Sequence, residues 1–208
     1  MKLDVPVIGI VRGVDEEFFT DIMFASFEAG LSAIELTMNT ENAARIVNKL
    51  AGRVPAGKLL GMGTIRNLNE AKAAADAGAM FFVTPNLDIE VVKFAVEKKI
   101  SMIAGALTPT EVYKARAEGA DMVKIFPSGL YGPQYFKDLN GPFDDIPLVA
   151  VGGVSIDNLK DYFKAGAKAV GVSSALFGSN ALKNKKIDRI SDNVKIFVRE
   201  CINCNQQL

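Results

Sequence analysis

A glycine that ends a helix-like segment recurs four times along the chain, and this pattern is the strongest constraint on the fold. Gly30, Gly78, Gly119 and Gly166 each follow an alanine-rich amphipathic stretch and precede a short apolar run, at successive spacings of 48, 41 and 47 residues. Glycine is favoured just past a helix end because it adopts the left-handed conformation without steric cost. The pattern therefore predicts helices that end at a glycine and lead directly into strands.

Eight short apolar runs alternate with helix-like segments. They cover residues 5–11, 33–37, 59–63, 80–84, 100–104, 121–126, 146–151 and 168–172. Several are nearly continuous in Val, Ile and Leu, which is typical of parallel strands buried on both faces. Dividing 208 residues among eight units gives 26 residues each, so the loops must be short. We expect a single (β/α)8 TIM barrel domain over residues 1–208, in the α/β class.

A doubly wound open sheet is the alternative fold for alternating strands and helices. It usually begins with a dinucleotide-binding glycine motif, and the nearest match here, Gly61-Met62-Gly63-Thr64, lacks the third glycine. We find no linker or composition shift that divides the chain. The last predicted helix, residues 187–201, carries apolar side chains at helical spacing and is expected to pack on the core and close the barrel.

Composition excludes several classes of protein. The 24 Lys and Arg residues balance 24 Asp and Glu residues, so the chain lacks the basic excess of a nucleic-acid-binding protein. The longest stretch without a charge has 14 residues, too few for a membrane span. We see no secretory signal and too few cysteines for a disulfide scaffold. We therefore expect a soluble cytoplasmic protein.

Histidine is absent from the chain. This removes Ser-His-Asp hydrolysis, histidine general-base catalysis and nearly every transition-metal site. Cys201 and Cys204 have the spacing of one of the two ligand pairs of a zinc site, but no His or further Cys completes the ligand set, so two free thiols are expected. Any catalysis must use Lys, Glu, Asp, Tyr, Ser, Thr, Arg or Cys.

A lysine interrupts the sixth apolar run. Strand alternation places Lys124 on one face with Met122 and Phe126, and places Val123 and Ile125 on the other. If the second face packs under helices, Lys124 points into the barrel, where burial lowers its pKa and makes the neutral amine a nucleophile that forms Schiff bases. The alternative is a strand-end lysine that pairs with a carboxylate or extends to the surface.

A carboxylate lies on the corresponding face of the second run. Glu35 shares that face with Ala33 and Thr37, whereas Ile34 and Leu36 share the other. Glu35 is a candidate general base, or the structural partner of the inward lysine. A buried glutamate suits Schiff-base chemistry because imine formation and hydrolysis each require proton transfer.

Polar groups and glycines follow the carboxyl ends of several other runs, where active sites of such barrels lie. Gly152 and Gly153 follow the seventh run and Ser174 follows the eighth; these loops hold phosphate in many barrels, because glycine lets backbone N–H groups approach an anion closely. Arg12 follows the first run and is either a clamp for a carboxylate or part of a surface ion pair. Thr64 and the segment Thr84-Pro85-Asn86 add polar groups at the same rim.

Five ordered segments resemble a known family. They are Ile34-Glu35-Leu36-Thr37, Gly61-Met62-Gly63-Thr64, Thr84-Pro85-Asn86, Lys124-Ile125-Phe126-Pro127 and Val151-Gly152-Gly153-Val154. Together they resemble the motifs of the class I aldolases that act on 2-keto-3-deoxy-6-phosphogluconate (KDPG) and 4-hydroxy-2-oxoglutarate (KHG). The resemblance spans nearly the whole chain. It implies a (β/α)8 barrel, usually a homotrimer, with no metal and no organic cofactor.

The resemblance also implies residue roles. Lys124 would form the Schiff base and Glu35 would be the general acid and base. Thr64, Pro85 and Phe126 would line the pyruvyl pocket, and Gly152, Gly153 and Ser174 would hold the substrate phosphate. The implied reaction cleaves a phosphorylated keto acid to pyruvate and glyceraldehyde 3-phosphate, with the imine as electron sink.

The chain departs from the gluconate-type pattern at the carboxylate-binding arginine. In many gluconate-type enzymes an arginine four residues after the glutamate binds the substrate carboxylate, but this chain has Asn39 there. Arg12 is the arginine that this chain has for the carboxylate instead. With Val151, where gluconate-type enzymes often carry threonine, and with residues 128–135, this resembles the branch that acts on the galactonate epimer. The sequence does not decide between the epimers or establish use of 4-hydroxy-2-oxoglutarate.

Two other functions fit the same residues. A sugar-phosphate isomerase or epimerase would use Lys124 to stabilise charge, without forming an imine. A catalytically silent protein would retain the pocket only to bind a phosphorylated ligand. The intact set of Lys124, Glu35 and Thr64 favours the aldolase over the silent binder.

Overall fold

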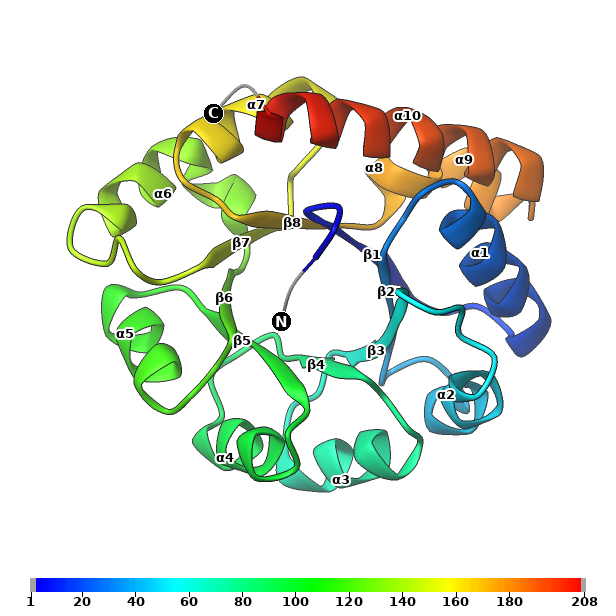
Figure 1. The fold of residues 1–208 in the computed structure, drawn as a ribbon, viewed down its shortest axis with the longest axis horizontal. Coiled ribbons are helices and arrows are strands. Elements are labelled where there is room, and N and C mark those ends of the chain that lie inside the picture. The colour runs from blue at the N-terminus through cyan, green and yellow to red at the C-terminus, as the bar shows by residue number, and fades with distance from the viewer. Residues whose placement is uncertain (1–2, 207–208) are drawn as a thin grey trace.

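A computed structural model describes residues 3–206 of the chain. Eight parallel strands pair in sequential order and close into a barrel surrounded by helices (Figure 1). The strands are β1 (Val7–Val11), β2 (Ala33–Thr37), β3 (Leu59–Gly63), β4 (Phe81–Val83), β5 (Ser101–Ala106), β6 (Met122–Ile125), β7 (Leu148–Val151) and β8 (Ala169–Val172). The predicted (β/α)8 barrel is confirmed, and each predicted run differs from its strand by at most two residues at either end.

Each strand is followed by at least one helix. The helices are α1 (Glu16–Glu28), α2 (Ala43–Ala51), α3 (Leu68–Asp76), α4 (Ile89–Glu97), α5 (Pro109–Ala117), the 3-10 helix η1 (Ser128–Leu130), α6 (Gly132–Asn140), α7 (Ile156–Lys164), α8 (Ser174–Phe177), α9 (Ser179–Lys183) and α10 (Ile187–Gln206). The recurring glycines follow α1, α3, α5 and α7, and their φ angles lie between 83° and 102°. The predicted left-handed glycine after these helices is confirmed.

The apolar side chains form two separate cores. Ile34, Leu36, Val123 and Ile125 belong to the core between the strands and the helices, as strand alternation predicts. Met122 belongs to the second core, which fills the inside of the barrel. The side chains of β2 and β6 that alternate with the outer set therefore point inward, which is where Glu35 and Lys124 lie.

The long helix α10 covers one side of the barrel. It packs against α1, α7 and α8, outside the place where β1 pairs with β8 to close the sheet (Figure 1). Ile190, Val194 and Phe197 on this helix are fully buried. The predicted core-facing helix is confirmed, although it runs beyond residue 201 to Gln206.

The amino-terminal segment closes one end of the barrel. Leu3 packs against the interior core, and the backbone carbonyl of Pro6 accepts a hydrogen bond of 3.0 Å from the Val170 amide of β8. The opposite end, at the carboxyl ends of the strands, contains a pocket that opens to solvent. No helix within residues 3–206 is both long enough and apolar enough to cross a membrane.

Candidate active site

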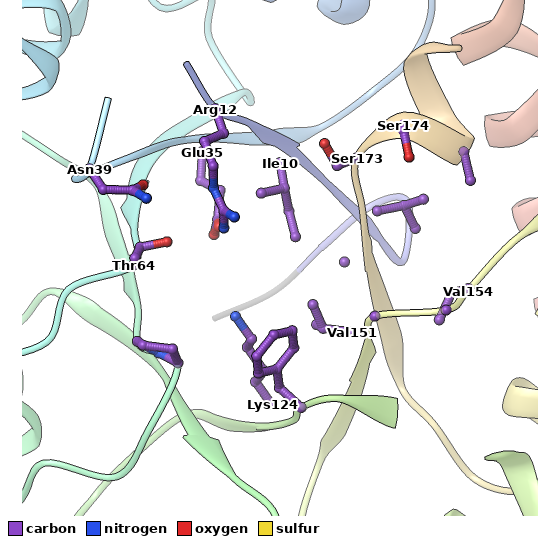
Figure 2. A pocket seen from close by; sticks show the side chains of 17 residues that line it. Ile10, Arg12, Glu35, Asn39, Thr64, Lys124, Val151, Val154, Ser173 and Ser174 are labelled. Carbon is purple, nitrogen blue, oxygen red and sulfur yellow. The ribbon is translucent and has the colours of Figure 1, made fainter. Parts of the chain in front are cut away.

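One pocket of about 450 Å³ lies at the carboxyl ends of the strands (Figure 2), within the size range of small-molecule sites. All nine residues that the sequence predicts for the site line it: Arg12, Glu35, Thr64, Pro85, Lys124, Phe126, Gly152, Gly153 and Ser174. They come from seven of the eight strand ends, so closure of the barrel is what brings them together.

Lys124 lies near the carboxyl end of β6 and is only 6% exposed. Its Nζ atom lies 4.8 Å from the centroid of the Phe126 ring. Burial lowers the pKa of Lys124; the Glu35 carboxylate opposes this shift, and the positive charge of Arg12 adds to it. Lys124 forms no salt bridge with any carboxylate in the described range. This disagrees with the alternative in which the lysine is paired with a carboxylate.

Glu35 projects from β2 into the same pocket and is 1% exposed. Its Oε2 atom has no hydrogen-bond partner among residues 3–206. Burial raises its pKa to about 7 from an ordinary 4.5, and the positive charges of Lys124 and Arg12 oppose the rise. A carboxyl group with a pKa near neutrality can both take up and release a proton at pH 7.

Two glycines of β3 make room inside the barrel. A Cβ on Gly63 would lie 2.1 Å from Oε1 of Glu35, and a Cβ on Gly61 would lie 2.5 Å from the Phe81 ring. Both positions point inward and must lack a side chain, because the acid and the ring occupy the space. The Gly61-Met62-Gly63 motif therefore serves packing around Glu35 and Phe81.

Arg12 is an exposed residue at the pocket rim, next to a small hydrogen-bond network. Its neighbour Gly13 donates its backbone N–H to Oγ1 of Thr40 at 2.9 Å. Oγ1 of Thr40 lies 3.2 Å from Oγ1 of Thr37, and both threonines are buried. This network ties the loop after β1 to the loop after β2, which also carries Asn39 into the pocket. The arginine lines the same pocket as Glu35 and Lys124, and no ion pair of Arg12 occurs among residues 3–206.

The rim after β3 and β4 contains Thr64 and Pro85. Thr64 has a positive φ of 56°, which is uncommon for threonine and turns the chain sharply after β3. Thr84, predicted to add a polar group to the rim, is fully buried; its hydroxyl accepts a hydrogen bond of 2.8 Å from the Gly105 amide. A Cβ on Gly105 would lie 2.4 Å from the Pro85 carbonyl carbon, so glycine there lets Pro85 approach the neighbouring strand.

Backbone amides and hydroxyls gather where β7 and β8 end. Gly152 and Gly153 have successive positive φ angles of 87° and 81°, and Ser173 and Ser174 line the adjacent wall (Figure 2). Glycine lets backbone N–H groups approach an anion closely. The predicted phosphate-binding residues are therefore together on one side of the pocket.

Sequence reasoning missed several apolar residues of the pocket, namely Ile10, Gly171, Val172 and Ala175. Alternation along β1 could have found Ile10, which is inward because Ile8 belongs to the interior core. The others carry no chemical signal. Cys201 and Cys204 are free, as predicted. No cluster of three or more His, Cys, Asp or Glu side chains suited to a metal is present in residues 3–206.

Comparisons with known proteins agree with this geometry. The family model for KDPG and KHG aldolases matches residues 2–193. A probable 2-dehydro-3-deoxy-6-phosphogalactonate aldolase of Rhizobium meliloti strain 1021 is 34% identical over 173 residues, which are 83% of this chain and 82% of that protein. A 2-dehydro-3-deoxy-phosphogluconate aldolase of Pseudomonas aeruginosa is also 34% identical, over 76% of this chain and 70% of that protein.

The solved structures include a close match to the whole barrel. A protein described as native KDPGal superposes with a TM-score of 0.92 at 30% sequence identity, over 99% of this chain and 98% of that one.

Proposed function

The chain belongs to the KDPG and KHG aldolase family, and from this premise we propose that it cleaves a 2-keto-3-deoxy-6-phospho sugar acid through a Schiff base on Lys124. As an aldolase it is a carbon–carbon lyase. The observation that supports the proposal most strongly is a desolvated lysine in one pocket with a fully buried carboxyl group whose pKa is about 7. The products are pyruvate and glyceraldehyde 3-phosphate.

The first stage forms the imine. The neutral amine of Lys124 attacks the C2 ketone of the substrate, and the carbinolamine that results loses water to give a protonated imine. Burial favours the neutral amine because it lowers the lysine pKa. Glu35, in its protonated form, donates the proton that leaves with the water.

The second stage breaks the carbon–carbon bond. Glu35, now a carboxylate, takes the proton of the C4 hydroxyl; the C3–C4 bond breaks, the aldehyde forms and the electron pair moves into the imine to give an enamine. Protonation at C3 and addition of water then release pyruvate and free Lys124. A carboxyl group with a pKa near 7 suits these alternating transfers, since both of its forms are populated at neutral pH.

Opposite ends of the substrate fit opposite sides of the pocket. We assign the carboxylate to Arg12, whose guanidinium can hold it with two parallel hydrogen bonds, and the phosphate to Gly152, Gly153 and Ser174. Thr64, Pro85 and Phe126 line the pyruvyl end. This arrangement places the ketone between the two anionic ends, at Lys124.

The galactonate epimer is the preferred substrate in this proposal. Support comes from Arg12 together with Asn39 and Val151 in the pocket, and from the relatives that are named for that epimer. Measurement of kcat/KM for the two phosphorylated epimers side by side tests the preference, and a higher value for the gluconate epimer would reverse it.

The proposal extends to assembly and location. We propose a homotrimer, as in most of the family, and light scattering on the purified chain tests this by its mass. Two free thiols suit a reducing compartment and support a cytoplasmic location.

Borohydride reduction in the presence of pyruvate tests the Schiff base directly. We expect a reduced pyruvyl adduct on Lys124, identified by peptide mass spectrometry, together with cleavage of the phosphorylated keto acid. If Lys124 stays unmodified while the substrate is isomerised, the protein is instead an isomerase or epimerase. No turnover of any 2-keto-3-deoxy sugar acid would indicate a silent binding protein.

A further inference from the structure

Ser128 is a buried serine behind the pocket wall, at the first residue of η1 after β6. It is 1% exposed, and its hydroxyl makes two hydrogen bonds to the ends of two strands. Oγ donates to the carbonyl of Ile125 at 2.7 Å and accepts from the backbone N–H of Val151 at 3.0 Å. Ile125 is the last residue of β6 and Val151 is the last residue of β7.

The hydroxyl contacts the two groups at the end of the ladder between β6 and β7. The Val123 amide donates to the Pro147 carbonyl at 2.9 Å, and Ile125 pairs with Ala150 in the ladder. In this parallel register the Val151 N–H and the Ile125 carbonyl face each other across the two strands. The Ser128 hydroxyl bonds to both groups, so it links the end of β6 to the end of β7 through η1.

A second set of contacts fixes the next residues of the same loop. The amide of Gly129 donates to the carbonyl of Gly152 at 2.8 Å. The two chains also pack without side chains between them, because a Cβ on Gly129 would lie 3.2 Å from Cα of Gly153. The position of Gly152 and Gly153 is therefore set by Ser128 and Gly129, which follow Lys124 on the neighbouring strand.

We propose that Ser128 is a positioning residue that sets the distance between Lys124 and the backbone amides of Gly152 and Gly153, and thereby the affinity for the substrate's phosphate. This inference rests on the proposed function. Without the hydroxyl, the two hydrogen bonds that fix the end of β7 against η1 are lost, and the turn that carries Gly152 and Gly153 is less firmly held. We expect the glycine amides then to shift from the phosphate while the reacting carbon stays at Lys124.

The test compares a ligand that carries phosphate with one that does not. For wild type and Ser128→Ala we would measure kcat and KM with the phosphorylated keto acid, and the pyruvate concentration that half-saturates borohydride trapping. We expect Ser128→Ala to raise KM about tenfold, the order expected for weakened charge-assisted hydrogen bonds, and to change pyruvate half-saturation less than about twofold. Ser128→Thr retains the hydroxyl and should restore most of the affinity.

A matched control is available in α1. Ser26 is also fully buried, and its hydroxyl has no hydrogen-bond partner in the described chain, so Ser26→Ala should leave both measurements unchanged. Gly129→Ala provides a second variant that removes no hydrogen bond. Its new methyl group should push Gly153 away by a few tenths of an ångström and raise KM for the phosphorylated substrate alone. Gly52→Ala, with no atom within 4 Å of the added Cβ, is its control.

The outcomes separate this inference from the proposed function. An unchanged KM in both Ser128→Ala and Gly129→Ala overturns the positioning role, and so does an equal rise in KM and in pyruvate half-saturation, which would indicate a general structural role. In both cases wild-type turnover and the pyruvyl adduct keep the proposed function intact. A wild-type protein that neither cleaves the substrate nor traps pyruvate overturns both.

Discussion

Glu35 and Lys124 project into one pocket from β2 and β6, which lie four strands apart in the eight-stranded barrel, and neither forms a salt bridge anywhere in residues 3–206. Burial acts on both groups, raising the pKa of the carboxyl and lowering that of the amine. A direct ion pair would have opposed both shifts. Without that pair, burial favours the neutral amine of Lys124 and the neutral acid of Glu35.

Replacing Lys124 tests the covalent step. Lys124→Ala should abolish turnover of the phosphorylated keto acid, because no imine can form, while leaving the fold intact. The melting temperature should not fall, since the variant removes a desolvated amine from the pocket. Steady-state kinetics, circular dichroism and thermal melts check this, with Lys137→Ala on the exposed face of α6 as control. Comparable activity in Lys124→Ala would remove the central assignment.

The Glu35 pKa predicts a pH dependence of stability. Between pH 4.5 and 7 the folded protein binds this proton and the unfolded chain does not, so the free energy of unfolding falls as pH rises through this window. The loss from this group is about 3.5 kcal/mol, at roughly 1.4 kcal/mol per pKa unit. Glu35→Gln removes this pH-dependent contribution, so the melting temperature of the variant relative to wild type should rise by about 7–14 °C between pH 4.5 and 8.

A second glutamate is the control for this pH experiment because its shift has the opposite sign. Backbone hydrogen bonds from Thr108 and Leu107 lower the pKa of Glu111. Its stabilising contribution is present above pH 4.5 and is lost as pH falls, so Glu111→Gln should become more destabilising as pH rises. If the difference between Glu35→Gln and wild type does not change with pH, the buried carboxyl does not titrate near neutrality.

Arg12→Ala should raise KM for the keto acid by about 10- to 100-fold, because a charge-assisted pair of hydrogen bonds to the carboxylate is lost. Pyruvate carries the same carboxylate, so its half-saturation in borohydride trapping should rise in parallel. Arg45→Ala is a suitable control, since Arg45 contacts Glu16 at the surface at 3.5 Å. Unchanged values for both ligands would show that Arg12 does not bind the carboxylate.

Two alanine substitutions in β3 test the space around the acid. Gly63→Ala should displace Glu35, whose Oε1 would lie 2.1 Å from the new methyl group, and should lower kcat by at least about tenfold. Gly61→Ala introduces the same methyl group two residues away but meets the Phe81 ring, so it should lower the melting temperature with a smaller loss of kcat. Equal kcat losses in the two variants would contradict the specific contact with Glu35.

Much of this fold could be predicted because its signals are local. Val123 and Ile125 flank Lys124, and Ile34 and Leu36 flank Glu35, so the alternation of each strand alone indicates which side chains face inward. The glycines after α1, α3, α5 and α7 mark the helix ends for an equally local reason. The prediction that Thr84 adds a polar group to the pocket rim is wrong. Its hydroxyl accepts a hydrogen bond from the Gly105 amide on the neighbouring strand, and no local sequence pattern indicates this contact.

The order of strands and helices, their inward faces and the residues available for chemistry are all predictable from the sequence, since each depends on neighbours along the chain. Three features appear only in the folded chain: Oε2 of Glu35 lacks a partner among residues 3–206, Gly63 makes room for this side chain, and the Ser128 hydroxyl links β6 to β7. Closure of the barrel explains this difference. Desolvation and contact across strands arise only when residues far apart in the chain enclose the same space.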